Sequence, residues 1–350
     1  MRNYLLVSFL MLIPTQLWGQ ENVEMEFGKQ AVETSSSLRG LCVVSSNVVW
    51  TTGSRGTILR TTDGKTWETI ALPGREEVEI RDVHAWDADH AIIMIAGQPA
   101  EFWETENGGQ QWQRVFVDPR EKSFYDDLLI DSQSGWGIAF GDVVHQAIPL
   151  VVRQPAGTWQ IAEDLADLSG HPQLHGYAAS GTSMVRTDQG RILLGTGGAS
   201  AEHAPATVLV SEPNNWRRWQ AVECPLPASE SAGIFSLALH GDQVVAVGGD
   251  YLKPKVREGT AAYSQDGGLT WVAADSLPAG YRSGVAVLAR PAGNVFVAVG
   301  TSGTDVSTDG GKNWQSINQL NLNAIRFADG GEVGWAVGSG CVYRIEVQGN

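Results

Sequence analysis

The sequence predicts an all-β protein, a β-propeller of seven four-stranded antiparallel blades. Three observations predict it: a hairpin motif ending in Trp recurs along the chain, short β-rich runs precede each copy, and Gly and Trp are in excess. Gly supplies 41 and Trp 13 of the 350 residues. Much Gly disfavours helices, because each helical Gly costs stability. With 43% hydrophobic residues the chain can fill a core, which excludes disorder as its main state.

The hairpin motif is the most regular feature. Four segments combine Ser or Thr, then Asp or Asn, then Gly, then Trp, at residues 61–67, 105–112, 264–271 and 307–314. In a tight turn the Asp or Asn side chain accepts backbone N–H groups, and Gly adopts the positive φ that other residues resist. We therefore assign structural turn roles to Asp63, Asn107, Asp266 and Asp309. Degenerate copies end at Trp159 and at Trp216 or Trp219.

Each hairpin closes a unit of four predicted strands. The β-rich runs ahead of the first and last motifs are residues 41–44, 48–52, 57–61, 285–288, 295–300 and 304–307. The motif then stands between the third and fourth strands. Successive motif Trp residues are 43 to 57 positions apart when Trp216 is taken, a period typical of propeller blades.

The two ends of the chain together complete the last blade. After Trp314 and its strand come only three more strands, at 322–328, 333–338 and 341–347. We expect residues 23–29 to supply the missing fourth strand and to close the ring. Six complete units and this shared one make seven blades. Six or eight blades are the alternatives, because the third and fourth units are degenerate.

The pattern of residues 1–19 is typical of a secretory signal peptide. We expect a single propeller domain at 20–350. Arg2 precedes an apolar run at 4–13, which Pro14 ends. The run is too short for a membrane span, so we expect a secreted or periplasmic protein and no integral membrane segment. A first core strand is the alternative reading of the run. Gly19 offers a cleavage position, although the larger Leu17 leaves the cut site open.

Charge and cysteine usage exclude several classes. Lys and Arg number 24 against 39 Asp and Glu, a formal charge of −15. Such a chain repels phosphate backbones and anionic membranes, so we expect no nucleic-acid partner. The three Cys residues, Cys42, Cys224 and Cys341, form no CxxC pair, and an odd number cannot all pair within one chain. The His residues lack the spacing typical of metal sites, so we expect no metal. We also expect no cofactor, and a monomer.

The motifs resemble the Asp-box, or BNR, repeat found in sialidases and other propellers. The segments at 38–41, 49–57 and 61–67 are similar to the photosystem II stability/assembly factor-type BNR family, although 61–67 is one residue short. Those at 280–284 and 300–311 fit its branch from non-photosynthetic bacteria, often labelled generically as oxidoreductases. The resemblance covers most of 37–347, weakly at 150–225. It implies a seven-bladed propeller with a non-catalytic role in assembling a partner.

A candidate site lies where the first strand of each blade begins. Aligned there are Arg39, Arg81, Asp126, Arg282 and Asn323. Three arginines would converge on one opening of the channel, and guanidinium groups suit carboxylates or phosphates. The predicted ligand-binding set is completed by neighbours in sequence and by the loops after second strands: Asp82, Tyr281, Asp142 and Asp250, with Tyr125, Asp127, His145, Tyr251 and Lys253 nearby. The alternative for each Arg is a bond to a neighbouring blade, and Asp142 and Asp250 could simply shape turns.

Three functions follow from this site. The first is a binding or assembly module whose arginines hold an acidic segment of a protein partner or an anionic small ligand. The second is a glycan-processing enzyme like the sialidases, with Tyr281 or Tyr125 as nucleophile and Asp82 or Asp126 as acid or base. The third is a quinone-type oxidoreductase, as the generic labels suggest; the Gly-rich stretch at 195–200 lacks the GxGxxG spacing of a dinucleotide site.

Overall fold

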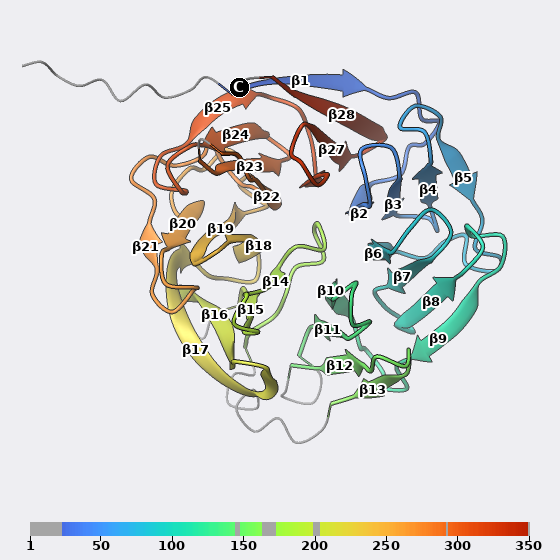
Figure 1. Cartoon of the computed structure of the whole chain (residues 1–350). Coiled ribbons are helices and arrows are strands. Elements are labelled where there is room, and N and C mark those ends of the chain that lie inside the picture. Colours follow the sequence, from blue (N-terminus) through green and yellow to red (C-terminus); the bar gives the residue numbers. More distant parts are fainter. Residues whose placement is uncertain (1–22, 144–147, 163–172, 199–203, 292, 349–350) are drawn as a thin grey trace, which may run out of the picture.

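Seven four-stranded antiparallel sheets surround a central channel in the computed structural model of the chain (Figure 1). The structure describes residues 23–143, 148–162, 173–198, 204–291 and 293–348. The predicted signal peptide at 1–19 and His145, His171 and His203 lie outside these residues. The predicted all-β propeller of seven blades is confirmed.

The strands follow one another from the channel outwards in each blade. The first strands, which lie innermost, are β2 (Leu38–Val43), β6 (Ile80–Ala85), β10 (Tyr125–Ile130), β14 (Met184–Arg186), β18 (Ala232–His240), β22 (Gly284–Leu288) and β26 (Ala324–Phe327). The second strands are β3 (Val49–Gly53), β7 (Ala91–Ile95), β11 (Gly137–Gly141), β15 (Ile192–Gly195), β19 (Gln243–Asp250), β23 (Val295–Gly300) and β27 (Val333–Gly338).

The third and fourth strands form the outer half of each blade. The third strands are β4 (Ile58–Thr61), β8 (Glu101–Thr105), β12 (Leu150–Arg153), β16 (Pro205–Glu212), β20 (Ala261–Ser264), β24 (Gly303–Ser307) and β28 (Cys341–Gln348). The fourth strands are β5 (Glu68–Ile70), β9 (Gln113–Val117), β13 (Trp159–Ile161), β17 (Asn215–Pro227), β21 (Val272–Ala273), β25 (Gln315–Asn318) and β1 (Glu24–Lys29). In the described part of the chain, no helix is long and apolar enough to cross a membrane.

The N-terminal strand closes the ring, as predicted. β1 pairs antiparallel with β28, from Glu24 opposite Gln348 to Lys29 opposite Tyr343. The seventh sheet therefore has the order β1-β28-β27-β26 and contains both ends of the described chain. Residues about 300 positions apart share one ladder of hydrogen bonds, which fixes blade 7 against blades 1 and 6.

The hydrophobic core consists of layers between neighbouring blades. Seven clusters of buried side chains each combine residues from two adjacent sheets. Between blades 1 and 2, for example, Trp50 and Ile58 pack with Ile80 and Ile93, and all four are fully buried. Apolar burial stabilises by roughly 25 cal/mol per Å², so the stability of the ring depends on every blade having both neighbours.

The repeated hairpins have the structure that their residues favour. Asp266 accepts backbone N–H groups from Leu269 at 3.0 Å and Thr270 at 2.9 Å, and Gly268 has a φ of 86°. The motif Trp then packs against the preceding blade of the ring. Ring pairs of this kind are Trp67 with Trp335 at 5.5 Å, Trp112 with Trp50 at 6.5 Å and Trp159 with Phe102 at 4.7 Å. The excess of Trp thus serves contacts between blades.

Candidate functional site

A stretch of residues 173–183, here called the channel segment, crosses the central channel ahead of β14 (Figure 1). Arginines from three blades donate hydrogen bonds to its main-chain carbonyls. Arg39 Nη1 reaches Ala179 O at 3.4 Å, Arg81 Nη1 reaches Ala178 O at 2.9 Å, and Arg326 Nη2 reaches Gly181 O at 2.7 Å. The segment therefore lies where the arginine ring was predicted to meet a ligand.

Arg39 and Arg81 are the predicted arginines that lie together. Each is partly buried at the start of the first strand of its blade. Burial lowers the pKa of Arg39, and the positive charge of Arg81 lowers it further. Arg81 also pairs with Glu79, with Nε 3.0 Å from Oε2, and 22% of its side chain remains exposed. Guanidinium groups hold donors beyond those already used, so this pair can still meet an anionic group from solvent.

Arg282 does not share this position. Its side chain is 0% exposed and forms an ion pair with Asp305 on β24, inside blade 6. Its Nη1 donates to the Ser302 hydroxyl at 2.9 Å and to Tyr281 O at 2.7 Å. Only Arg39 and Arg81 of the three predicted arginines therefore lie at one opening. Arg282 instead joins strands within its own blade.

Two of the predicted aspartates, Asp126 and Asp142, accept hydrogen bonds from the backbone of the channel segment. Asp126 and Asp142 accept the backbone N–H groups of Ala178 and Gly176, respectively. Burial raises the pKa of both carboxyls, and the neighbouring Asp142 raises that of Asp126 further. One oxygen of each, Asp126 Oδ2 and Asp142 Oδ1, is buried without a hydrogen-bond partner within the described residues.

Polar side chains on or just ahead of the first strands also join successive blades. Asp82 is buried, and its oxygens accept Val83 N at 2.8 Å and Leu128 N, from blade 3, at 2.9 Å. Burial, followed by the nearby Asp127, raises the pKa of Asp82. Equivalent bonds between blades are Met184 N to Asp127 Oδ2, Val285 N to Ser236 Oγ, Ser283 Oγ to Asn323 O and Asn323 Nδ2 to Leu38 O. Asp82, Asp127 and Asn323 thus hold the ring together.

The two candidate tyrosines are buried. Tyr281 is 4% exposed, and burial raises its phenol pKa, with a smaller opposing effect of Arg39. Tyr125 donates its hydroxyl to Asp118 at 2.7 Å, and burial likewise raises its pKa. A nucleophile must reach its substrate, and the side chains of Tyr125 and Tyr281 are almost inaccessible to solvent, at 0% and 4% exposed. This arrangement disfavours the glycosidase hypothesis.

An aromatic cluster adjoins the channel segment. Tyr177 stacks on Phe235 of β18 with centroids 3.7 Å apart, and Phe235 meets Tyr281 edge-on at 4.8 Å. Asp250 stands beside the cluster, at the end of β19. Burial alone would raise its pKa, but hydrogen bonds from Ser231, Leu252 N and Lys253 lower it overall. Asp250 is therefore a charged group at the edge of an apolar surface.

Gly197, in the Gly-rich stretch of the oxidoreductase hypothesis, has a packing role in this structure. Gly197 forms backbone bridges with both His175 and Gly233. A Cβ at Gly197 would lie 2.2 Å from Tyr177 Oη. Only Gly permits the Tyr177 side chain to come this close to the backbone, so Gly197 allows the channel segment to pack against blade 5.

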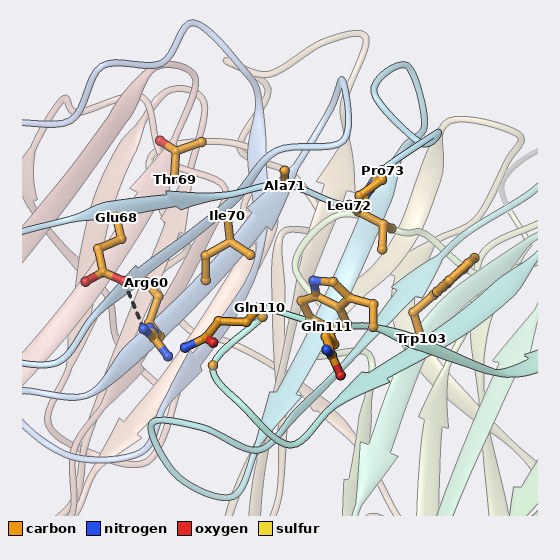
Figure 2. Close-up of a pocket in the computed structure, with 13 residues that line it drawn as sticks. Arg60, Glu68, Thr69, Ile70, Ala71, Leu72, Pro73, Trp103, Gln110 and Gln111 are labelled. Atoms are coloured by element: carbon orange, nitrogen blue, oxygen red, sulfur yellow. Dashed lines mark hydrogen bonds and ion pairs between the residues drawn. The ribbon is translucent and has the colours of Figure 1, made fainter.

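A cavity lies away from the channel, between β5 and the hairpin that joins β8 to β9 (Figure 2). Its volume is about 870 Å³, and Leu72, Trp103 and Gln110 are among the lining residues. Arg60 at one end is ion-paired with Glu68, Nη2 to Oε2 at 2.9 Å. None of the predicted site residues lines it.

Comparisons with known proteins agree with the fold and with the predicted resemblance. A family model described as photosynthesis system II assembly factor YCF48 matches residues 20–122. Among solved structures, YCF48 bound to D1 peptide is 18% identical with a TM-score of 0.60, covering 91% of this chain and 94% of that chain. YCF48 from Cyanidioschyzon merolae is 17% identical with a TM-score of 0.61, covering 91% and 98%. Similarity to the predicted family is thereby confirmed.

The architecture is also shared with propellers of other families. The Neurospora crassa Pan2 WD40 domain is 12% identical, with a TM-score of 0.59 over 90% of each chain. Identities this low establish the fold alone. No curated protein matches this sequence.

Proposed function

We propose that this chain, which resembles the photosystem II assembly factor-like BNR propellers, is a binding module in the assembly of a partner protein. Its site is the channel opening around Arg39 and Arg81, where it takes an acidic segment of the partner or an anionic small ligand. The observation that carries the proposal is the pairing of these two arginines. Their guanidinium groups already donate to peptide carbonyls of the channel segment, which is the chemistry that a bound peptide would require.

The electrostatics support an acidic ligand. The chain carries a formal charge of −15, so a cationic ligand would be attracted almost anywhere on its surface, whereas an anionic one needs a local positive site. Arg39 and Arg81 supply such a site, with Glu79 as the adjacent carboxylate. Charge-assisted hydrogen bonds between guanidinium and carboxylate are roughly twice as strong as neutral ones. The similarity to a propeller solved with a bound peptide points the same way.

Affinity capture with a double variant tests the proposal. The wild-type protein and an Arg39→Ala/Arg81→Ala variant would be used as bait against an extract of the source cells, with bound proteins identified by mass spectrometry. Arg114→Ala is the matched control, since this arginine pairs with Glu101 on the outer wall. We expect the double variant to lose a partner that both wild type and control retain. If the double variant retained every partner and anionic ligand, the proposed site would be wrong.

We also propose that the protein acts outside the cytoplasm. The support is the sequence of residues 1–19, in which Arg2 precedes a ten-residue apolar run. Cell fractionation of the full chain and of a variant lacking residues 2–19 tests this. Export of the full chain, and retention of the shortened one, is the expected result; equal distribution of both would contradict it.

A further inference from the structure

Residues 251–259 of the loop between β19 and β20, here called the docking loop, expose apolar side chains beside the channel opening. Tyr251 is 47% exposed, Leu252 69% and Val256 42%. They are three of the seven large hydrophobic side chains most exposed in the described part of the chain. Ala232 of β18 is paired with Asp250, so this docking loop leaves the sheet at the end where the first strand begins. Grouped apolar side chains on a surface are typical of interaction sites.

The docking loop is held firmly by its backbone. Tyr251 N donates to Ser231 O at 3.1 Å, and Tyr281 N donates to Pro254 O at 3.0 Å. Arg257 Nη2 donates to Leu277 O at 2.8 Å, which attaches the far end of the loop to the connection that leads into blade 6. The apolar side chains are therefore exposed by an ordered backbone. Preorganisation of this kind reduces the entropy cost of binding.

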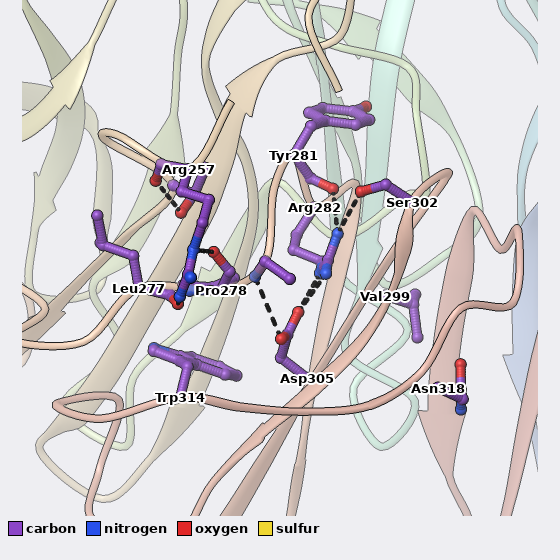
Figure 3. Close-up of polar contacts among 12 residues, drawn as sticks. Arg257, Leu277, Pro278, Tyr281, Arg282, Val299, Ser302, Asp305, Trp314 and Asn318 are labelled. Atoms are coloured by element: carbon purple, nitrogen blue, oxygen red, sulfur yellow. Dashed lines mark hydrogen bonds and ion pairs between the residues drawn. The ribbon is translucent and has the colours of Figure 1, made fainter. Parts of the chain in front are cut away.

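Arg282 is a positioning residue for this loop (Figure 3). Its Nη1 donates to Ser302 Oγ at 2.9 Å, and Ser302 Oγ in turn donates to Pro254 O at 2.9 Å. The ion pair with Asp305 fixes the guanidinium inside blade 6. A buried charge pair is thus connected through one hydroxyl to the backbone of the docking loop, which gives Arg282 a role other than ligand contact.

Aromatic contacts connect the loop with the channel opening. Tyr251 meets Phe235 edge-on with centroids 6.3 Å apart, and Phe235 stacks on Tyr177 of the channel segment. The buried ring of Phe235 therefore connects the docking loop with the channel segment that Arg39 contacts.

The loop is basic although the protein is acidic. Residues 251–259 contain Lys253, Lys255 and Arg257 and one acidic residue, Glu258, a net charge of +2 in a chain of −15. Lys253 pairs with Asp250 at 3.3 Å but keeps 70% of its side chain exposed. Exposed lysines beside exposed apolar side chains favour a ligand that combines negative charge with an apolar group.

We propose that the docking loop binds an acidic protein segment carrying an aromatic or large aliphatic side chain, which packs against Tyr251, Leu252 and Val256. This deepens the proposed function and rests on it for the acidic character of the partner. A membrane is disfavoured, because recognition of anionic lipids generally uses a cluster of about four to eight basic residues and the whole chain is strongly acidic. A second copy is disfavoured by the mutual repulsion of two acidic chains.

Selection from a displayed library of random dodecapeptides tests the inference, with the wild-type chain as bait. A Leu252→Ser/Val256→Ser variant removes the apolar contacts, and a Lys253→Glu/Lys255→Glu variant reverses the charge. Leu269→Ser/Val272→Ser is the matched control, since these apolar residues are exposed in the hairpin at the opposite end of blade 5. All substituted side chains are on the surface, and equal melting temperatures establish that the variants fold.

We expect the wild type and the control to enrich peptides with Asp or Glu around one aromatic or large aliphatic residue. Both docking-loop variants should bind the selected peptides roughly tenfold more weakly, the loss expected for one large apolar contact. The inference is overturned if no such peptides are enriched, or if both loop variants bind them as well as wild type does.

Three further measurements separate the alternatives. Loss of binding in Arg39→Ala/Arg81→Ala with none in the loop variants would keep the proposed function and reject the docking loop; the reverse result would keep the loop and reject the arginine site. Cosedimentation with phosphatidylcholine–phosphatidylserine vesicles that depends on Leu252 would assign the loop to a membrane instead. Leu252-dependent dimerisation in analytical ultracentrifugation would assign it to a second copy.

Discussion

The guanidinium of Arg81 donates a hydrogen bond of 2.9 Å to the carbonyl of Ala178, 97 positions later in the chain. Ala178 also donates its N–H to the buried carboxyl of Asp126. The channel segment is thus held at both the carbonyl and the N–H of one residue, by a cation from blade 2 and a carboxyl from blade 3.

Replacing Arg81 should loosen the channel segment. In Arg81→Ala we expect faster amide hydrogen exchange at residues 176–182 and a loss of about 1 kcal/mol in the free energy of unfolding, the usual net value of one hydrogen bond. Exchange measured by mass spectrometry after digestion gives the local effect, and urea denaturation the global one. Arg114→Ala should leave exchange in the channel segment unchanged. Wild-type exchange rates in Arg81→Ala would mean that the bond does not hold the segment.

The buried carboxyl of Asp126 should make the protein less stable as the pH rises. Its pKa is raised in the folded state, chiefly by burial and then by Asp142, so the folded protein retains a proton that the unfolded chain releases. The resulting stabilisation is complete below the ordinary carboxyl pKa of about 4 and is lost as the pH rises through the raised value. In Asp126→Asn this dependence should weaken.

At pH 8 we therefore expect Asp126→Asn to be more stable than wild type, because the substitution removes the cost of ionising a buried carboxyl. Urea denaturation at pH 4 and pH 8 measures the difference. Asp309→Asn is the control, because hydrogen bonds in the hairpin lower the pKa of Asp309 despite its burial. An Asp126→Asn variant less stable than wild type at pH 8 would show that the ionised carboxyl is needed there.

The Arg282–Asp305 pair should be costly to break from one side. Asp305→Ala leaves a guanidinium buried without its counterion, and removal of one member of a buried pair typically costs about 3–5 kcal/mol. We expect the double variant Arg282→Met/Asp305→Leu to lose less than Asp305→Ala alone. Chemical denaturation of the three proteins measures both values. Equal losses in the single and double variants would argue against an unpaired charge as the cause.

Removing one hydroxyl should disturb the docking loop without unfolding blade 6. Ser302→Ala deletes the group that accepts from Arg282 and donates to Pro254 O. We expect faster amide exchange at residues 251–256 and a stability loss of about 1 kcal/mol. Thr301→Ala, at an exposed neighbouring position, should change neither. If the loop amides exchanged at the wild-type rate in Ser302→Ala, the connection from Arg282 to the loop would be unimportant.

The propeller was predictable because its signals are local. Asp266 and the Gly residues that follow it determine their turn within a few positions, and each turn is followed by a Trp that packs against the neighbouring sheet. Counting these units, and noting the three strands left after Trp314 and its own strand, was enough to predict a closing strand at 23–29, which the structure has at Glu24–Lys29.

The arrangement of the site was less accessible, because it depends on contacts between distant residues. Arg39 and Arg81 are the second residues of β2 and β6, whereas Arg282 lies two residues before β22, where it pairs with Asp305 inside its own blade. The channel segment precedes a degenerate unit and carries no motif. Its partners Arg39, Arg81 and Arg326 are about 100 to 145 positions away in sequence, and a single sequence contains no pattern that pairs them.

Closure of blade 7 determines the order in which the protein can be completed. β1, the first strand of the described chain, has no partner until β28, which ends at Gln348, has formed. β1 therefore stays unpaired while the other six blades are synthesised, and during this time its edge is open to other protein segments. A protein truncated anywhere before β28 consequently lacks the partner of β1. The edge of β1 then remains open to pairing with other chains and to proteolysis.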